Sequence, residues 1–248
     1  MKVNLVLSGG AARGIAHIGV IKALEELGFE ISAVSGVSAG ALVAAFYCDG
    51  YTPQEMLKIA KSKDWLKYLR PTFPKLGFVS LREAGKFLSK SLSFQQIEES
   101  KKKLSIGAVD IKTGKTLYFD KGSLIPILLG SCALPGIFEP VRYKEYLLVD
   151  GGLTNNLPVE PLLFMEGLLV GVDVNPNMTV EKVSNIFQLL LRSLLLAVRS
   201  NADKRKELCH VVIEPELYNY SPFDLLKAEE IYKLGYEKTM NVMRAYAK

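Results

Sequence analysis

The first fifty residues alternate short apolar runs with segments whose apolar positions recur at helical spacing. The apolar run 3–7 stops at two glycines, which predicts a buried strand. After Gly14 the apolar positions recur every three or four residues as far as Gly28, which predicts a helix that ends there. The segments 31–35 and 39–48 predict a second strand and a second, strongly apolar helix.

The next fifty residues predict two helices joined by a loop. Thr52 and Glu55 have the spacing of a capping box, so a helix is expected from residue 53 towards residue 68. Two prolines and a glycine in the segment 71–77 predict a loop. A further helix is expected to begin after Ser80.

The remainder of the chain begins with a predicted β-hairpin and continues as alternating helices and strands. The segments 104–110 and 116–119 flank a turn at 112–115 that contains glycine. Strands are then expected at 146–149, 168–174 and 211–213, and helices at 124–129, 180–199 and 224–245. The alternation is not interrupted by a linker or a repeat. We therefore expect one three-layer α/β/α domain over residues 1–248 with a mostly parallel central sheet.

Composition places the chain among globular proteins and argues against several partners. Of the 248 residues, 49% are hydrophobic and 23% are charged, which excludes a disordered or fibrous chain. The net charge of +5 is spread out, and the run Lys101–Lys103 is too short for a nucleic-acid-binding tail. Weak attraction to anionic lipid headgroups remains open. With two histidines and no C-x-x-C pair, we expect neither a metal nor a disulfide.

The apolar segments are too short for a secretion signal or a membrane span. The run 3–7 is shorter than the core of a signal peptide. The most apolar stretch, 186–198, is interrupted by Gln188, Arg192 and Ser193. We therefore expect a cytoplasmic protein, with peripheral contact to a membrane surface as an open alternative.

A G-x-S-x-G pattern lies where the second strand is expected to turn into the second helix. It is made of Gly36, Val37, Ser38, Ala39 and Gly40. A strand-to-helix turn this tight needs small neighbours around the serine, and the helix N-terminus favours a developing negative charge. The alternative is an ordinary glycine-rich turn. The context favours Ser38 as a nucleophile.

A second glycine-rich turn links the first strand to the first helix. It comprises Gly9, Gly10, Ala11, Ala12, Arg13 and Gly14. Small side chains leave backbone N–H groups accessible at a helix N-terminus, which suits an anion. A dinucleotide fingerprint needs glycine at Ala11, and a P-loop needs lysine after Gly14, so nucleotide binding is the weaker interpretation. An oxyanion hole fits better, because acyl transfer needs two N–H donors beside the nucleophile.

The group that activates Ser38 has several candidates. His210 would complete a serine–acid–histidine order, although only one strand and one helix precede the turn. His17 is expected to be a partly buried helix residue. Asp150 ends a predicted strand, where sites in α/β proteins collect, and is followed by Gly151 and Gly152. A carboxylate can act as a general base if burial raises its pKa. Asp173, in the strand after Asp150, is a rival carboxylate.

Together these motifs resemble those of the patatin-like phospholipase family. The matching segments are 9–14, 36–40, 133–140, 150–152 and the Asn-Asn-Leu-Pro sequence at 155–158. The core motifs lie within 4–174, and the chain is similar to small prokaryotic members and to the catalytic domain of the neuropathy-target-esterase group.

The resemblance implies a Ser–Asp dyad that works without histidine, metal or cofactor. Ser38 would be the nucleophile, Asp150 the base, and the backbone of the turn 9–14 the oxyanion hole. Ala11 departs from the glycine common in the family, which is tolerated if the loop needs no positive φ there. Family substrates are acyl esters of lipids, including phospholipids, lysophospholipids and neutral glycerides.

Two alternatives to a lipid hydrolase stay open. One is a catalytically idle protein that binds lipid or acyl groups, and the other is a Ser-His-Asp esterase for small soluble esters that uses His210. The helix 54–68 carries lysines beside apolar residues, which fits an interfacial lid or a solvated face equally. For the apolar helix 186–198 we expect packing in the core.

Overall fold

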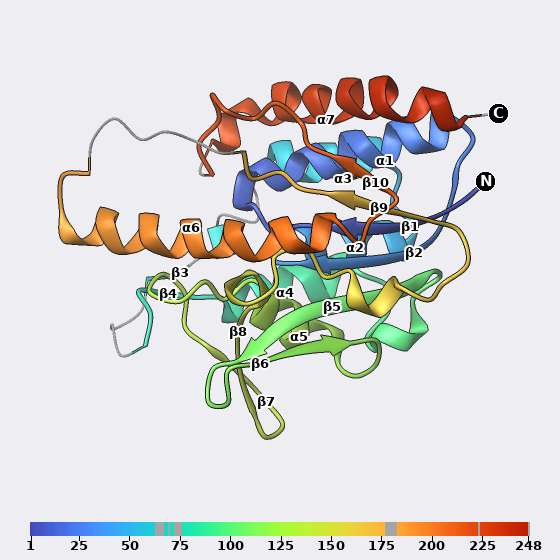
Figure 1. Ribbon diagram of the computed structural model, residues 1–248. Coiled ribbons are helices and arrows are strands. Elements are labelled where there is room, and N and C mark those ends of the chain that lie inside the picture. Colours follow the sequence, from blue (N-terminus) through green and yellow to red (C-terminus); the bar gives the residue numbers. More distant parts are fainter. Residues whose placement is uncertain (63–66, 69, 72–75, 177–182, 223, 248) are drawn as a thin grey trace.

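The computed structural model describes residues 1–62, 67–68, 70–71, 76–176, 183–222 and 224–247. An eight-stranded, mostly parallel sheet forms its centre (Figure 1). In spatial order the strands are β10 (Val211–Ile213), β9 (Leu168–Val172), β1 (Lys2–Leu7), β2 (Glu30–Val37), β5 (Lys103–Asp110), β8 (Tyr146–Asp150) and β7 (Val141–Tyr143), with β6 (Lys115–Phe119) also paired to β5. The five strands from β10 to β5 are parallel, and β6, β7 and β8 are antiparallel to their neighbours.

Helices cover both faces of the sheet, which explains why β1 is apolar almost throughout. Leu5 and Leu7 belong to the larger buried cluster, which includes residues of α1 (Ala16–Glu26), α2 (Ala39–Asp49), α4 (Arg82–Ser91), α5 (Leu124–Ser131) and α7 (Ala228–Met243). Val6 points the other way and packs with Leu157 and with Ala202 of α6 (Ile186–Lys206). The predicted α/β architecture with a mostly parallel sheet is confirmed.

The helices α1 and α7 lie side by side on the sheet (Figure 1). A Cβ atom on Gly19 would lie 2.0 Å from the Tyr232 carbonyl oxygen, and one on Gly235 would lie 2.1 Å from that of Ala16. Glycine at both positions therefore lets the two backbones touch. The first helix of the chain is packed by the last one.

The strands β2 and β8 meet end to end along one edge of β5. Residues 106–110 of β5 pair with β6, and residues 103–107 and 108–110 pair with β2 and β8 respectively. Because β6 occupies one edge, β2 and β8 must share the other. Val37, the last residue of β2, pairs with Gly107, and Asp150, the last residue of β8, pairs with the next residue, Ala108. The chain therefore leaves β2 and β8 at neighbouring positions, beside residues 107 and 108 of β5.

Most predicted elements are present, and the differences are local. The capping box at Thr52 forms, with Glu55 accepting its N–H at 2.8 Å, and α3 (Pro53–Ser62) follows; residues 63–66 of the expected helix lie outside the described residues. The loop prediction for 71–77 was incomplete, because the two-residue strands β3 (Arg70–Pro71) and β4 (Val79–Ser80) pair beside it. Residues 72–75 of the predicted loop lie outside the described residues, and residue 77 belongs to no helix or strand.

The helix α6 differs most from its prediction. It continues to Lys206, beyond the expected end at residue 199, and its predicted start at 180 lies outside the described residues. Its first half is not core: Ile186 is 70% exposed and Leu190 is 62% exposed. Figure 1 shows this half extending past the sheet. The apolar pattern reported a helix correctly but did not reveal that nothing in the described chain covers it. Among the described residues, no helix combines the length and the apolar character needed to cross a membrane.

Short 3₁₀ helices connect several elements, and one of them forms the second glycine-rich turn. This helix, η1 (Ala11–Ile15), precedes α1. The others are η3 (Ile97–Glu99), η4 (Gly151–Leu153), η5 (Glu160–Leu162), η6 (Leu225–Lys227) and η7 (Arg244–Tyr246). Asp150 is the N-cap of η4, so the end of β8 turns directly into a helical turn.

Candidate active site

Ser38 occupies a strained turn between β2 and α2. Its φ of 53° and ψ of −126° lie in a region that residues with a side chain rarely adopt. The turn packs too closely for larger neighbours: a Cβ on Gly36 would lie 2.6 Å from the Gly40 backbone, and one on Gly40 would lie 2.4 Å from the Leu7 carbonyl oxygen. The two glycines therefore permit the turn, as the sequence pattern predicted.

A buried serine anchors this turn from α5. The Ser38 N–H donates to Ser131 Oγ at 2.8 Å, and the Ser131 hydroxyl donates to the Gly107 carbonyl oxygen at 2.6 Å. Since Gly107 belongs to β5, the turn is tied to the strand that also pairs with β8. Ser131 was not among the predicted site residues, and no pattern in the sequence singled it out.

Asp150 lies at the point where β8 meets β2. Its side chain accepts a hydrogen bond from the Gly152 N–H at 2.8 Å, and the residue is 6% exposed. A Cβ on Gly151 would lie 2.4 Å from Val37 Cγ2, so glycine permits the close approach. Burial raises the pKa of the Asp150 carboxyl to about 6, although hydrogen bonding from the Ser38 side chain and the Gly152 N–H opposes this shift. The structure thus brings a half-buried serine together with a buried carboxyl group whose pKa is raised.

The second glycine-rich turn runs beside Ser38. A Cβ on Gly9 would lie 3.1 Å from Ser38 Cβ, and one on Gly14 would lie 2.6 Å from Ala39 Cβ. Three N–H groups of the turn are engaged within the protein. Gly9 donates to Asn156 Oδ1 at 3.2 Å, Ala12 to the Pro222 carbonyl at 2.9 Å, and Arg13 to the Gly10 carbonyl at 3.1 Å. In the described part of the chain, the N–H groups of Gly10 and Ala11 have no acceptor.

The backbone of Ala11 corrects one expectation. The sequence analysis made tolerance of Ala11 conditional on the loop needing no positive φ there, and this condition is not met: its φ is 49°, in the left-handed region. An alanine in this region costs about 1 kcal/mol relative to its usual conformations. The turn holds Ala11 there because its neighbours are fixed: Ala12 bonds to Pro222, and the Arg13 Nε donates to the Tyr220 carbonyl at 2.8 Å.

Neither histidine is placed to activate Ser38. His17 is fully buried, and its Nε2 donates to the Ser8 carbonyl at 2.8 Å; burial lowers its pKa to about 4. His210 accepts the Leu169 N–H at its Nδ1, near the start of β9. The strand registers put His210 level with Ala33, five residues before Ser38, or roughly 16 Å along the sheet. The Ser-His-Asp alternative through His210 is therefore wrong on geometry.

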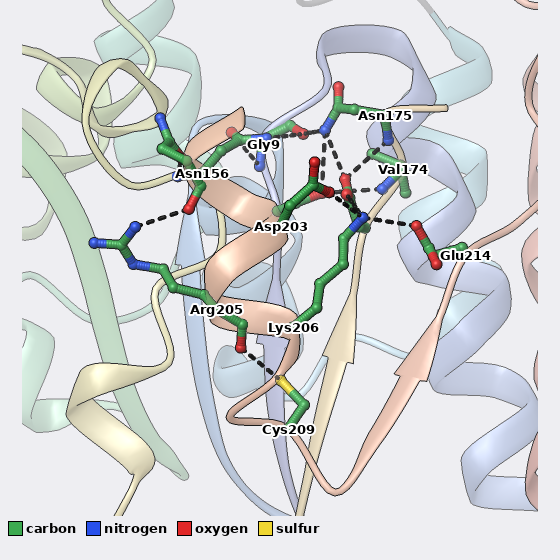
Figure 2. A network of polar contacts seen from close by, with 12 residues as sticks. Gly9, Asn156, Val174, Asn175, Asp203, Arg205, Lys206, Cys209 and Glu214 are labelled. Atoms are coloured by element: carbon green, nitrogen blue, oxygen red, sulfur yellow. Dashed lines mark hydrogen bonds and ion pairs between the residues drawn. The ribbon is translucent and has the colours of Figure 1, made fainter. Parts of the chain in front are cut away.

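Asp173 has a different partner from Asp150. Its Oδ2 lies 2.7 Å from Lys206 Nζ, near the end of α6, and its Oδ1 accepts both the N–H and the Nδ2 of Asn175 at 3.0 Å. Asn175 Nδ2 also donates to the Gly9 carbonyl at 2.7 Å. Figure 2 shows Lys206 reaching toward this group, with Asp203 and Glu214 beside it. Both carboxylate oxygens of Asp173 are thus engaged, one by a cation and the other by Asn175.

Asn201 of α6 ties the other side of the site together. Its Oδ1 accepts the Asn156 N–H at 2.7 Å, and its Nδ2 donates to the Gly152 carbonyl at 3.0 Å. Asn156 in turn holds the Gly9 N–H. Asn156 lies in the Asn-Asn-Leu-Pro segment already noted in the sequence, whereas Asn175, Asn201 and Lys206 had no signal there. These four residues connect the carboxylate segment, the glycine-rich turn and α6.

The assembled groups suit acyl transfer. A hydroxyl beside a buried carboxylate can act as a nucleophile, and two N–H groups without an acceptor can stabilise an oxyanion. Among the described residues, histidine, cysteine, aspartate and glutamate side chains do not gather in a group of three that could hold a metal ion.

Comparison with known proteins agrees with the motifs. A family model described as patatin-like phospholipase matches residues 5–163. A lysophospholipase NTE1 of Meyerozyma guilliermondii is 27% identical over 267 residues, covering 94% of this chain and 19% of the relative. An uncharacterized NTE family protein of Mycobacterium bovis is 32% identical over 195 residues, covering 73% of this chain and 54% of the relative. The chain thus spans about a fifth of the first of these proteins.

A solved structure shares the fold. The crystal structure of VipD from Legionella pneumophila matches with a TM-score of 0.56 and 18% sequence identity, covering 98% of this chain and 66% of that one. At this identity the likeness concerns the fold alone.

Proposed function

The chain belongs to the patatin-like phospholipase family, and from that premise we propose that it hydrolyses lipid esters with Ser38 as nucleophile and Asp150 as general base. The observation that carries the proposal is the end-to-end meeting of β2 and β8 on β5, which puts Ser38 and Asp150 next to each other. The pKa of Asp150, raised to about 6 by burial, makes the carboxylate a stronger base than an exposed one while leaving it charged at pH 7.

The reaction has two stages. In the first, Ser38 Oγ attacks the ester carbon while its proton moves to Asp150, and the carbonyl oxygen becomes an oxyanion. As the tetrahedral species collapses, the C–O bond to the alcohol breaks and Asp150 gives its proton to the leaving alcohol oxygen. In the second, water attacks the acyl-serine ester, again with Asp150 taking the proton and returning it to Ser38 Oγ as the fatty acid leaves.

The oxyanion hole is proposed at two of the six residues of the turn 9–14. The N–H groups of Gly10 and Ala11 are without an acceptor, whereas those of Gly9, Ala12 and Arg13 donate within the protein. Gly14 lies inside η1, where it provides close packing against Ala39. The left-handed backbone at Ala11 re-aims its N–H relative to an ordinary helical turn, and this supports a functional reason for the strain.

We propose a lipid ester as substrate, with peripheral contact to a lipid surface through the first half of α6. Relatives named as lysophospholipases support the substrate class. The helix exposes Ile186, Leu189, Leu190 and Leu196. From residue 183 to residue 202 the sequence has two arginines and no acidic residue, which suits an anionic surface. The proposal treats residues 1–248 as one catalytic domain.

An active-site probe and a substrate series test the proposal. The wild-type protein should be labelled by a fluorophosphonate and should hydrolyse a lysophospholipid and long-chain p-nitrophenyl esters. Ser38→Ala should lose both labelling and turnover, and Ser32→Ala, which removes a partly exposed hydroxyl elsewhere on β2, should still be labelled. A folded wild-type protein that is neither labelled nor active would instead be an idle lipid-binding protein.

A further inference from the structure

The polar contacts between α6 and the glycine-rich turn lead to an inference that rests on the function proposed above. We propose that Lys206 and Asp173 are positioning residues of the oxyanion hole. Acting through Asn175, they fix the peptide between Gly9 and Gly10 so that the Gly10 N–H faces the reacting carbonyl.

The first step of the argument is the geometry of one peptide group. A trans peptide is planar, so its C=O and N–H point in opposite directions. Asn175 Nδ2 holds the Gly9 carbonyl oxygen at 2.7 Å. That contact also fixes the direction of the Gly10 N–H, which has no acceptor among the described residues. Asn175 therefore controls a proposed oxyanion donor without touching the substrate.

The second step is that this peptide cannot be held by its own side chains. Gly10 must be glycine, because a Cβ there would lie 2.4 Å from Val174 Cγ2. Gly9 is equally confined, with a Cβ falling 2.7 Å from Asn156 Oδ1. Two consecutive glycines leave the backbone free to rotate unless contacts from elsewhere restrain it. The restraint comes from Asn156 on the Gly9 N–H and from Asn175 on the Gly9 carbonyl.

The third step concerns what holds Asn175. Both its backbone N–H and its side-chain Nδ2 donate to Asp173 Oδ1 at 3.0 Å, which fixes the rotamer of the amide. The other oxygen of Asp173 is paired with Lys206 Nζ at 2.7 Å. The Asp173 side chain is 1% exposed and that of Lys206 is 15% exposed. The ion pair with Lys206 offsets the cost of burying the Asp173 carboxylate and fixes its orientation.

A buried ion pair adds little net stability, because both charges lose their hydration on burial. Apolar residues of similar size often stabilise a protein as well. Its location is therefore informative. Lys206 also contacts Asp203 at 3.0 Å and Glu214 at 2.7 Å, but both of these carboxylates are about half exposed. Of the three contacts, only the one with Asp173 connects Lys206 to Gly9, through the Asn175 side chain. The two outer partners supply matched controls for the inner one.

The experiment compares variants of the full chain on a soluble p-nitrophenyl ester and with a long-chain trifluoromethyl ketone. Addition of Ser38 Oγ to the ketone carbon, with its proton passing to Asp150, makes an oxyanion that needs the same donors as the reaction. Lys206→Met should lower kcat about 10²-fold, because a small misplacement of a catalytic donor costs that much. KM should change less than about twofold, and inhibitor affinity should fall in parallel with kcat.

Three further variants complete the test. Lys206→Arg should recover most of the lost kcat, and Asp203→Asn and Glu214→Gln should stay within about twofold of wild type. Asn175→Ala leaves the ion pair intact and should reproduce the loss of kcat and of inhibitor affinity, which keeps the test decisive if Lys206→Met does not fold.

The possible outcomes separate this inference from the proposed function. Wild-type kcat in folded Asn175→Ala, or a fall in kcat without a fall in inhibitor affinity, would overturn the positioning role. Wild-type activity in Ser38→Ala would instead overturn the proposed function itself. The parallel loss in Asn175→Ala and Lys206→Met, with Ser38→Ala inactive, supports both.

Discussion

Asp150 and Asp173 are two aspartates in similar positions with different surroundings. Each stands at the carboxyl end of a strand, and they are 6% and 2% exposed. Among the ion pairs of the described residues none involves Asp150, whose neighbours are neutral donors, and burial raises its pKa to about 6. Asp173 is paired with Lys206. Strand position alone therefore does not make a base. A cation beside a buried carboxylate favours the charged form and so makes the carboxylate a weaker base.

The largest expected effect of this difference is on turnover. Asp150→Asn should lower kcat by at least about 10³-fold, because the amide keeps the shape but cannot accept the Ser38 proton. Asp173→Asn keeps an oxygen for Asn175 and should lower kcat only about tenfold. Steady-state kinetics on a soluble ester measures both, with circular dichroism to verify folding. If the two variants lose the same activity, the assignment of the base to Asp150 loses its support.

The pH dependence should carry the signature of Asp150. The base works only when deprotonated, so kcat/KM should rise with pH through a single ionisation near 6 and level off above it. At pH 5 the activity should be roughly a tenth of its plateau value. A profile recorded between pH 4.5 and 9 measures this. Asp173→Asn serves as the control and should keep the same midpoint. A shifted midpoint in Asp173→Asn would indicate that the ionisation belongs to Asp173 and not to Asp150.

Stability should respond to the two substitutions with opposite signs. The folded pKa of Asp150 lies above the unfolded value of 3.8, so the folded state binds this proton more tightly. Its charge therefore costs stability as pH rises from about 4 to 6. At pH 8, Asp150→Asn should raise the free energy of unfolding by about 3 kcal/mol, and most of this gain should vanish near pH 4.

Asp173→Asn should instead destabilise the protein at pH 8, by roughly 1–3 kcal/mol, because Lys206 then lacks its most buried partner. Urea unfolding of both variants at pH 8 and pH 4.5 measures the two effects. Destabilisation by Asp150→Asn at pH 8 would contradict the raised pKa.

The smallest effect is expected at His210. This side chain is bonded to the start of β9, far from Ser38, so His210→Ala should leave kcat and the midpoint of the pH profile unchanged within about twofold. Kinetics across the same pH range measures this. An imidazole-like ionisation that disappears in His210→Ala would show that neither carboxylate is the base.

The sequence predicted those parts of the candidate site that depend on local chain geometry. Ser38 and the glycines around it lie within five residues, and the need for small neighbours is visible in the pattern itself. The pairing of β2 and β8 on one edge of β5 was not visible, because apolar periodicity carries no information on strand direction. The contact of Lys206 with Asp173 likewise joins residues far apart in the chain.

Two features of the structure depend on distant parts of the chain and could not be read from local patterns. The first half of α6 was expected in the core, yet Leu189, Leu190 and Leu196 are exposed, since an apolar pattern reports what a helix could bury and not what lies beside it. The positive φ at Ala11 could only be left open, because the contacts that hold the turn come from residues 220 and 222, more than 200 residues away.

That attachment has a consequence for how the protein is made. The glycine-rich turn is synthesised long before Pro222, whose carbonyl accepts the Ala12 N–H. At 5–20 residues per second, roughly 10–40 s of translation separate the two. Throughout that interval α1 also lacks α7, against which its backbone packs. Ser38, the proposed nucleophile, is therefore present in the nascent chain long before the loop beside it is fixed, and we expect no activity before α7 has been made.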